Sequence, residues 1–153
     1  MKKFTFSLQP VLKAKQIFKK QKQAEYAQAC AELEKLFSIK RSLEEELEKC
    51  ADEYAAAMES ATTGQRIAWY YDYTGFIREK LLRLETLIRD AREKKDALRE
   101  QLVAMTREAD ALGKLKEEQY REYLYETAKE EEKVLGDLMS YERSAKNSES
   151  EPA

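Results

Sequence analysis

Two long series of apolar residues at heptad spacing restrict the fold of this sequence more than any other feature. In the first series, apolar residues recur at alternating steps of three and four between Ala29 and Ala57. In the second, the same rhythm runs from Ile67 to Leu112. Side chains at this spacing lie on one side of an α-helix and pack against the matching side of another helix. The sequence therefore predicts two long helices that form a coiled coil.

The two series also define the core positions that we expect. They are Ala29, Leu33, Leu36, Lys40, Leu43, Leu47, Cys50, Tyr54 and Ala57 in the first, and Ile67, Tyr70, Thr74, Ile77, Leu81, Leu84, Ile88, Ala91, Lys95, Leu98, Leu102, Met105, Ala109 and Leu112 in the second. Upstream, the pattern Leu8, Val11, Lys15, Phe18, Lys22 joins the first series at Tyr26 through two successive steps of four. This irregularity predicts a stutter, which locally unwinds a supercoil. After Gly113 the apolar residues no longer keep one register, so we expect less regular packing there.

Composition supports an all-α fold. The chain of 153 residues has only 4 glycines and 2 prolines, and 38% of it is charged, against about 25% in an average protein. These are too few turn-forming residues for a β-sandwich, a β-barrel or an α/β fold. Gly75 lowers helix stability by about 1 kcal/mol, whereas burial of each Leu or Ile side chain stabilises the fold by roughly 1.5–3 kcal/mol. The second helix should therefore continue through Gly75.

One segment in the middle of the chain is suited to a reversal. Residues 59–64 are rich in small and turn-forming residues, and Thr62 with Gln65 forms a capping-box pattern. We expect a single antiparallel two-helix hairpin over residues 1–143, with helices at about 7–60 and 65–142 and a turn at about 59–64. Ser7 is the expected N-cap of the first helix. Facing residues should have numbers that add up to about 127, and residues 144–153 should form a disordered tail.

The sequence offers no catalytic, cofactor-binding or metal-binding residues. It has no histidine, and its two cysteines, Cys30 and Cys50, would lie about 30 Å apart on one helix. Neither a zinc site, a Ser-His or Cys-His nucleophile, nor an intrachain disulfide fits these facts, and we expect reduced thiols. No segment has the pattern of a secretory signal or a membrane span. The glutamate runs 44–46 and 130–132 are interpreted as solvated helix faces.

Charge and length point to partners at the open end of the hairpin. The first 24 residues carry seven lysines and no acid, whereas acids outnumber bases after Glu117. This asymmetry favours the antiparallel alignment and docking on an acidic partner, while the absence of arginine clusters argues against nucleic acid. The second helix should extend about 30 Å past the first and carry Tyr120, Tyr123 and Tyr125. Such a helix either binds a partner or frays in solution.

Aromatic residues concentrate after the predicted turn. The segment 69–76 contains five of the fifteen aromatic residues of the chain. At about 100° per residue, Trp69, Tyr73 and Phe76 share a stripe that lies beside the core positions. Two interpretations follow: the stripe is an exposed protein-binding surface, or the loop around Thr63 folds over it.

Three sequence motifs in order resemble the flagellar export protein FliJ family. They are the opening Phe4-x-Phe6-x-Leu8-Gln9-Pro10-Val11-Leu12, the central Tyr73-x-x-Phe76-Ile77 and the ending Glu130-Glu131-Glu132-Lys133-Val134-Leu135-x-Asp137-Leu138. The resemblance implies a long antiparallel two-helix coiled coil, similar to the stalk subunit of rotary ATPases, without enzymatic activity. It also implies a place in the cytoplasm, peripherally associated with the membrane at the base of the flagellum.

The resemblance implies three kinds of partner: the hexameric export ATPase with its regulator, the cytoplasmic domain of the export-gate membrane protein, and export chaperones. The gate-binding residues that it implies are Tyr73 and Phe76, with Leu47 and Tyr54 as facing positions on the first helix. Trp69 is a further candidate partner-binding residue because it shares the aromatic stripe with them. Cys50, where the family often has an aromatic residue, and Lys80, where an apolar residue is expected, depart from its pattern.

Two other readings of the same coiled coil remain. One is a stalk protein of a non-flagellar type III secretion system, and the other is a purely structural coiled coil that associates with itself.

Overall fold

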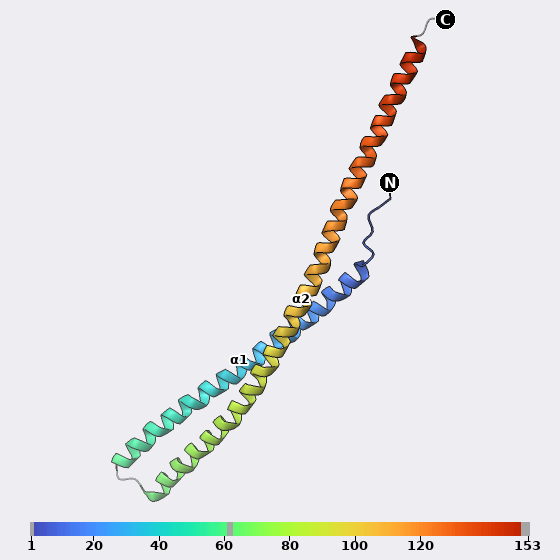
Figure 1. Ribbon diagram of the computed structural model, residues 1–153. Coiled ribbons are helices and arrows are strands. Elements are labelled where there is room, and N and C mark those ends of the chain that lie inside the picture. Colours follow the sequence, from blue (N-terminus) through green and yellow to red (C-terminus); the bar gives the residue numbers. More distant parts are fainter. Residues whose placement is uncertain (1, 61–62, 151–153) are drawn as a thin grey trace. The chain divides into compact units, whose positions relative to one another are not determined.

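The computed structural model describes residues 2–60 and 63–150, which form two long helices (Figure 1). Helix α1 is Gln9–Glu59 and helix α2 is Gly64–Glu149. No strand is present in the described ranges. The two helices pack against each other, which confirms the predicted two-helix hairpin. Helix α2 also continues through Gly75, as expected.

Helix α1 begins two residues later than the sequence suggested. The Gln9 amide donates to the Phe6 carbonyl at 3.0 Å, which closes a turn, and the Leu12 amide donates to the Leu8 carbonyl at 2.9 Å. Leu8 therefore occupies the N-cap position in place of Ser7, which lies in the preceding turn. Pro10 falls in the first helical turn, where its missing N–H costs little.

Helix α2 begins after Thr63, whose carbonyl accepts hydrogen bonds from the amides of Arg66 (3.1 Å) and Ile67 (3.3 Å). Residues 61–62 of the expected turn, including Thr62 of the capping box, lie outside the described residues.

At its other end, α2 continues to Glu149, past the expected boundary near residue 142. The Ser144 hydroxyl donates to the Ser140 carbonyl at 3.0 Å, and the Ser148 hydroxyl donates to the Ala145 carbonyl at 2.8 Å. Serine side chains that bond to the preceding turn are compatible with a continuous helix. Residues 151–153 of the expected tail lie outside the described part of the chain.

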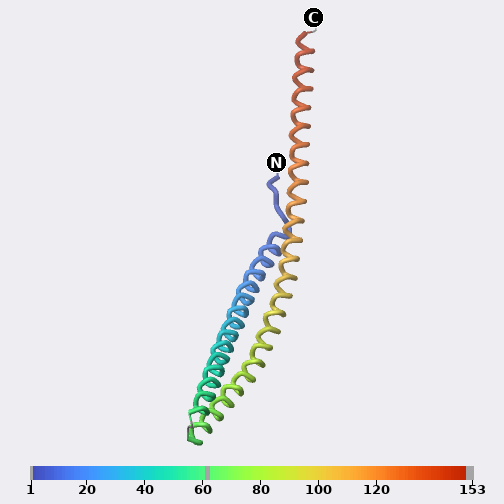
Figure 2. Tube along the Cα trace, turned by 90° about the vertical axis from the view of Figure 1, so that its left-hand side faces the viewer, coloured from blue at the N-terminus to red at the C-terminus, as the bar shows by residue number. Residues whose placement is uncertain are grey.

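The chain divides into two compact units. The hairpin unit is Phe18–Met105, and the terminal unit consists of residues 2–17 with residues 106–150. The hairpin unit contains the turn, with α1 and α2 running side by side from it (Figures 1 and 2).

Two buried clusters join the helices of the hairpin unit. Leu33 of α1 packs with Leu84 and Ile88 of α2, and nearer the turn Cys50 and Ala57 pack with Tyr70. As residue numbers rise along α1, the numbers of their partners fall along α2, so the helices are antiparallel.

The predicted core positions are confirmed over most of both helices. Every position of the two heptad series, from Ala29 to Ala57 and from Ile67 to Leu112, is buried or half-buried. Ile77 is the most enclosed, with 1% of its surface exposed. Lys40 and Lys95 are half-buried at core positions, where their aliphatic stems cover apolar surface while the ammonium groups reach solvent.

The predicted stutter in the first helix is wrong. Leu12 is buried and Lys15, Lys19, Lys22 and Tyr26 are half-buried, so steps of three and four continue without interruption from Leu12 to Ala57. In contrast, Val11 and Phe18 are 44% and 53% exposed. Lysine stems substitute for apolar side chains at these positions, so the apolar pattern predicts Phe18 as the core residue although its neighbour Lys19 occupies that position.

In the terminal unit, the non-helical segment of residues 2–8, which we call the N-terminal strap, packs on α2. The Phe4 ring lies 5.2 Å from that of Tyr120 and 5.5 Å from that of Tyr123, and the Tyr123 hydroxyl donates to the Lys2 carbonyl at 2.8 Å. Phe6 is buried. The strap thus continues the antiparallel contact with α2 past the first residue of α1.

The packing register in this part of α2 is more regular than the sequence suggested. Lys116, Gln119 and Tyr123 are half-buried at steps of four, three and four after Leu112, although their side chains are largely polar. From Ala128 to Ser150 every residue is exposed.

A pair of neighbouring residues tests the packing of the hairpin unit. Ile88 is 7% exposed and Leu87 is 54% exposed on the same turn of α2. We expect Ile88→Ala to lower the free energy of unfolding by about 2–5 kcal/mol, because it leaves a cavity in the cluster with Leu33 and Leu84. Leu87→Ala should change it by about 0.5 kcal/mol or less. Denaturant unfolding followed by far-UV circular dichroism measures both, and equal effects would contradict the register.

Candidate partner-binding surface

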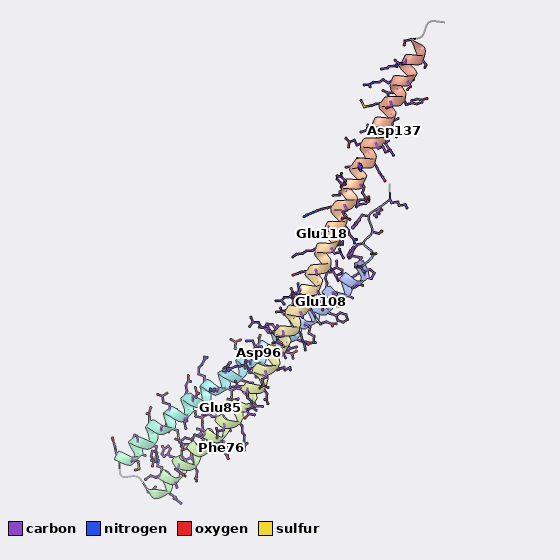
Figure 3. The ribbon with its side chains drawn as sticks, in the orientation of Figure 1. Phe76, Glu85, Asp96, Glu108, Glu118 and Asp137 are labelled. Atoms are coloured by element: carbon purple, nitrogen blue, oxygen red, sulfur yellow. The ribbon has the colours of Figure 1, made fainter. Side chains whose placement is uncertain are left out.

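The aromatic stripe lies on α2 in the hairpin unit, and Figure 3 shows Phe76 near the end of the unit at which the chain turns. Trp69 and Phe76 are 56% and 51% exposed, and Tyr73 is half-buried. Large aromatic side chains with this much exposure are frequent in protein-binding surfaces. Of the two interpretations, a covered stripe and an exposed one, the structure supports the exposed one at Trp69 and Phe76.

Trp69 is held in place by its neighbours. Its ring stacks on that of Tyr73, with centroids 5.1 Å apart and an interplanar angle of 7°, and it meets the Tyr70 ring edge to face at 5.1 Å. A fixed aromatic side chain loses less conformational entropy when a partner binds it. The stack therefore presents a pre-organised apolar surface.

Tyr73 connects this surface to α1. Its ring packs against the cluster of Cys50, Ala57 and Tyr70, and its hydroxyl donates a hydrogen bond to the Glu46 carboxylate. Sequence reasoning missed Glu46, which it assigned to a solvated run of glutamates. The expected rule, by which the numbers of facing residues add up to about 127, places Tyr73 opposite Tyr54, about two helical turns from Glu46. The contacts of Tyr73 with Glu46 and of Leu33 with Leu84 and Ile88 show a register shifted by several residues from that expectation.

The two predicted facing residues of α1 are both half-buried core positions. Tyr54 packs against the Cys50 cluster and meets the Tyr70 ring edge to face at 6.2 Å. The structure thus brings Tyr54, Trp69 and Tyr73 into one network through Tyr70. Leu47 is half-buried at a heptad position of α1.

Phe76 stands apart from the stack and has a cationic neighbour. The Lys80 ammonium lies 4.5 Å from the centroid of the Phe76 ring, one helical turn away. A cation over an exposed aromatic face contributes about 0.5–1 kcal/mol. Lys80 therefore adds a positive charge to the apolar surface.

The two thiols have different environments. Cys50 is buried in the cluster with Tyr70, whereas Cys30 is half-buried. Burial raises the pKa of the Cys50 thiol above its ordinary value, and the nearby carboxylates of Glu53 and Glu46 raise it further. The protonated thiol is thus favoured in the folded protein, which makes Cys50 a poor nucleophile.

The described residues contain no group of three or more acidic, histidine or cysteine side chains that could hold a metal ion. Within the same part of the chain, neither helix includes a stretch sufficiently long and apolar to cross a membrane.

Fold and surface together define a class: an antiparallel two-helix coiled coil with large aromatic side chains exposed near its turn. The family model described as flagellar FliJ protein matches residues 4–148. The chain therefore belongs to the FliJ family, whose members are components of the flagellar export apparatus and not enzymes. Neither the comparison with curated proteins nor the comparison with solved structures gives a match.

The thiol environments lead to a test by chemical modification. The pKa of the Cys50 thiol is higher in the folded protein than in the unfolded chain, so the folded state favours the protonated thiol. The contribution of Cys50 to the free energy of unfolding is therefore fully present below the pKa of the unfolded thiol. It is lost as the pH rises through the pKa of the folded thiol. At pH 8 we expect 5,5′-dithiobis(2-nitrobenzoate) to react faster with Cys30, measured in Cys50→Ser, than with Cys50, measured in Cys30→Ser. Both variants should react at similar rates in guanidinium chloride, and equal rates in the folded state would contradict the burial of Cys50.

Proposed function

We propose that this FliJ-family protein acts as the stalk of the hexameric export ATPase, contacts the cytoplasmic domain of the export gate and escorts export chaperones. The match to the family over residues 4–148 carries this proposal, since it covers both the hairpin and its terminal unit. The protein would work in the cytoplasm and associate peripherally with the membrane at the flagellar base.

The aromatic stripe supports the proposed contact with the gate. Trp69 and Phe76 are exposed, and the stack of Trp69 on Tyr73 holds the apolar surface in a fixed geometry. Tyr54 and Leu47 would support this surface from α1 as half-buried core residues and not as direct contacts. Lys80 would favour a gate surface with a carboxylate near the site of Phe76.

A substitution at Phe76 should affect gate binding much more than the stability of the hairpin. Because Phe76 is exposed and its one described ring contact is with Lys80, Phe76→Ala should change the free energy of unfolding by about 1 kcal/mol or less. It should weaken binding of the gate domain by about 2 kcal/mol, roughly thirtyfold in Kd. Tyr71→Ala is the matched control, since Tyr71 is 75% exposed and lies off the stripe. Isothermal titration calorimetry and thermal unfolding on the same proteins measure both effects.

Tyr73→Ala should behave differently, because it removes a core contact and the hydrogen bond to Glu46 as well as the stack with Trp69. We expect it to lower both stability and affinity. Unchanged gate affinity in Phe76→Ala, or an equal loss in Tyr71→Ala, would argue against the gate contact.

The terminal unit supports the proposed contact with the ATPase. Its part of α1 and the strap carry lysines, and its part of α2 extends past the strap (Figures 1 and 2). The apolar side chains of that extension are exposed. A stalk that enters a ring needs such a projecting segment, and surface charge accelerates its association.

A truncation after Thr127 removes the fully exposed segment and keeps the strap contacts with Tyr120 and Tyr123. We expect this variant to lose binding and stimulation of the ATPase, whereas a control truncation after Lys146 should retain both. Binding by the full chain should weaken as salt rises above about 0.1 M, where the Debye length is roughly 10 Å. Full ATPase stimulation by the protein that ends at Thr127 would exclude this role for the segment.

A further inference from the structure

The last part of α2 carries an apolar face that no described residue covers. Its members recur at steps of three, four and seven, which places them on one side of the helix. They are Leu124, Ala128, Val134, Leu135, Leu138 and Tyr141, which we call the distal face. Leu124, Val134, Leu135, Leu138 and Tyr141 are between 47% and 74% exposed, although other parts of α2 bury residues at the same spacing.

Two carboxylates interrupt this face. Glu131 and Glu142 occupy heptad positions in the series Leu124, Ala128, Glu131, Leu135, Leu138, Glu142, Ala145, and they lie eleven positions apart. The other acidic residues of the segment, such as Glu132 and Asp137, lie off that series. In Figure 3, Asp137 marks this exposed part of α2.

The position of the two carboxylates argues against a second copy of the chain as the occupant. A parallel pair would place each Glu131 beside Glu131 of the other copy. An antiparallel pair that joins Leu135 to Leu138 would place Glu131 beside Glu142. Both alignments bring like charges together within an apolar contact, which is destabilising.

The strap shows that α2 accepts an aromatic side chain directly before the distal face. It places the Phe4 ring against Tyr120 and Tyr123. The depression that Lys2 lines together with Glu126 and Glu130 lies on another side of α2. The side chain that already packs on α2 here is thus apolar. The distal face continues from Tyr120 through Leu124 along the same side of the helix.

We propose that the distal face binds an amphipathic helix of a partner protein that carries two basic side chains about three turns apart within an apolar stripe. The apolar residues of that helix would cover Leu135 and Leu138, and its basic residues would pair with Glu131 and Glu142. This inference rests on the proposed role of the terminal unit as a docking surface and specifies the chemistry of the partner.

A charge exchange tests the proposal. The probe is a synthetic helical peptide that spans the length of residues 124–145, has leucine at its heptad core positions and carries two arginines eleven positions apart on that stripe. A second peptide has glutamate in place of both arginines. Fluorescence anisotropy with labelled peptides should show tighter binding of the arginine peptide to the full-length protein, by about tenfold or more.

In Glu131→Arg/Glu142→Arg the preference should reverse toward the glutamate peptide. The matched control is Glu132→Arg/Asp137→Arg, which changes the net charge by the same amount off the heptad series and should keep the original preference. All four residues are exposed, so circular dichroism should show that both variants remain folded.

Equal binding of the two peptides, or equal reversal in the control variant, would overturn the proposal. Concentration-dependent dimers of the full-length protein in sedimentation velocity that Leu135→Glu/Leu138→Glu abolishes would overturn it in favour of a second copy. If the truncation after Thr127 abolishes ATPase stimulation while the charge exchange has no effect, the docking role stands and the chemistry proposed for its partner fails.

Discussion

The antiparallel register between α1 and α2 is the constraint on which the rest of the structure depends. The short connection between Glu59 and Gly64 sets it, because a reversal at this point determines which residue of one helix meets which residue of the other. In the hairpin unit this register brings Leu33 to Ile88 and Cys50 to Tyr70. It also brings Glu46 of α1 to Tyr73 of α2, and so attaches the aromatic surface to the opposite helix.

The sequence was sufficient to predict the fold class, the region of the turn and most core positions, since apolar residues at heptad spacing report directly on the buried side of a helix. It was wrong at Lys19, which is half-buried where the apolar Phe18 was expected, because hydropathy does not register a buried aliphatic stem beneath an exposed charge. It also left undecided whether the aromatic stripe is covered. Exposure depends on residues from other parts of the chain, and periodicity within one helix does not contain that information.

Lysines at core positions have a cost and a benefit. Lys15, Lys19 and Lys22 give less apolar burial than leucine would, so the helix pairing they belong to is weaker than that around Ile77 or Leu84. A polar residue at a core position also penalises alternative alignments, because a shift of register would place its charge in an apolar environment. The Lys15 ammonium accordingly meets the Glu108 carboxylate at 2.5 Å in the terminal unit.

The position of Tyr73 couples events on the outer surface to the pairing of the helices. Its ring supports Trp69, and its hydroxyl is bound to Glu46 across the hairpin. By thermodynamic linkage, a ligand that packs on Trp69 and leaves the phenol in place strengthens helix pairing, and tighter pairing in turn raises the affinity for that ligand. A ligand that accepts a hydrogen bond from the Tyr73 hydroxyl must displace Glu46. Ligand binding then weakens helix pairing, and tighter helix pairing lowers the affinity for that ligand. If the coupling is positive, a bound ligand makes the hairpin a more rigid rod. If it is negative, a bound ligand favours separation of the two helices.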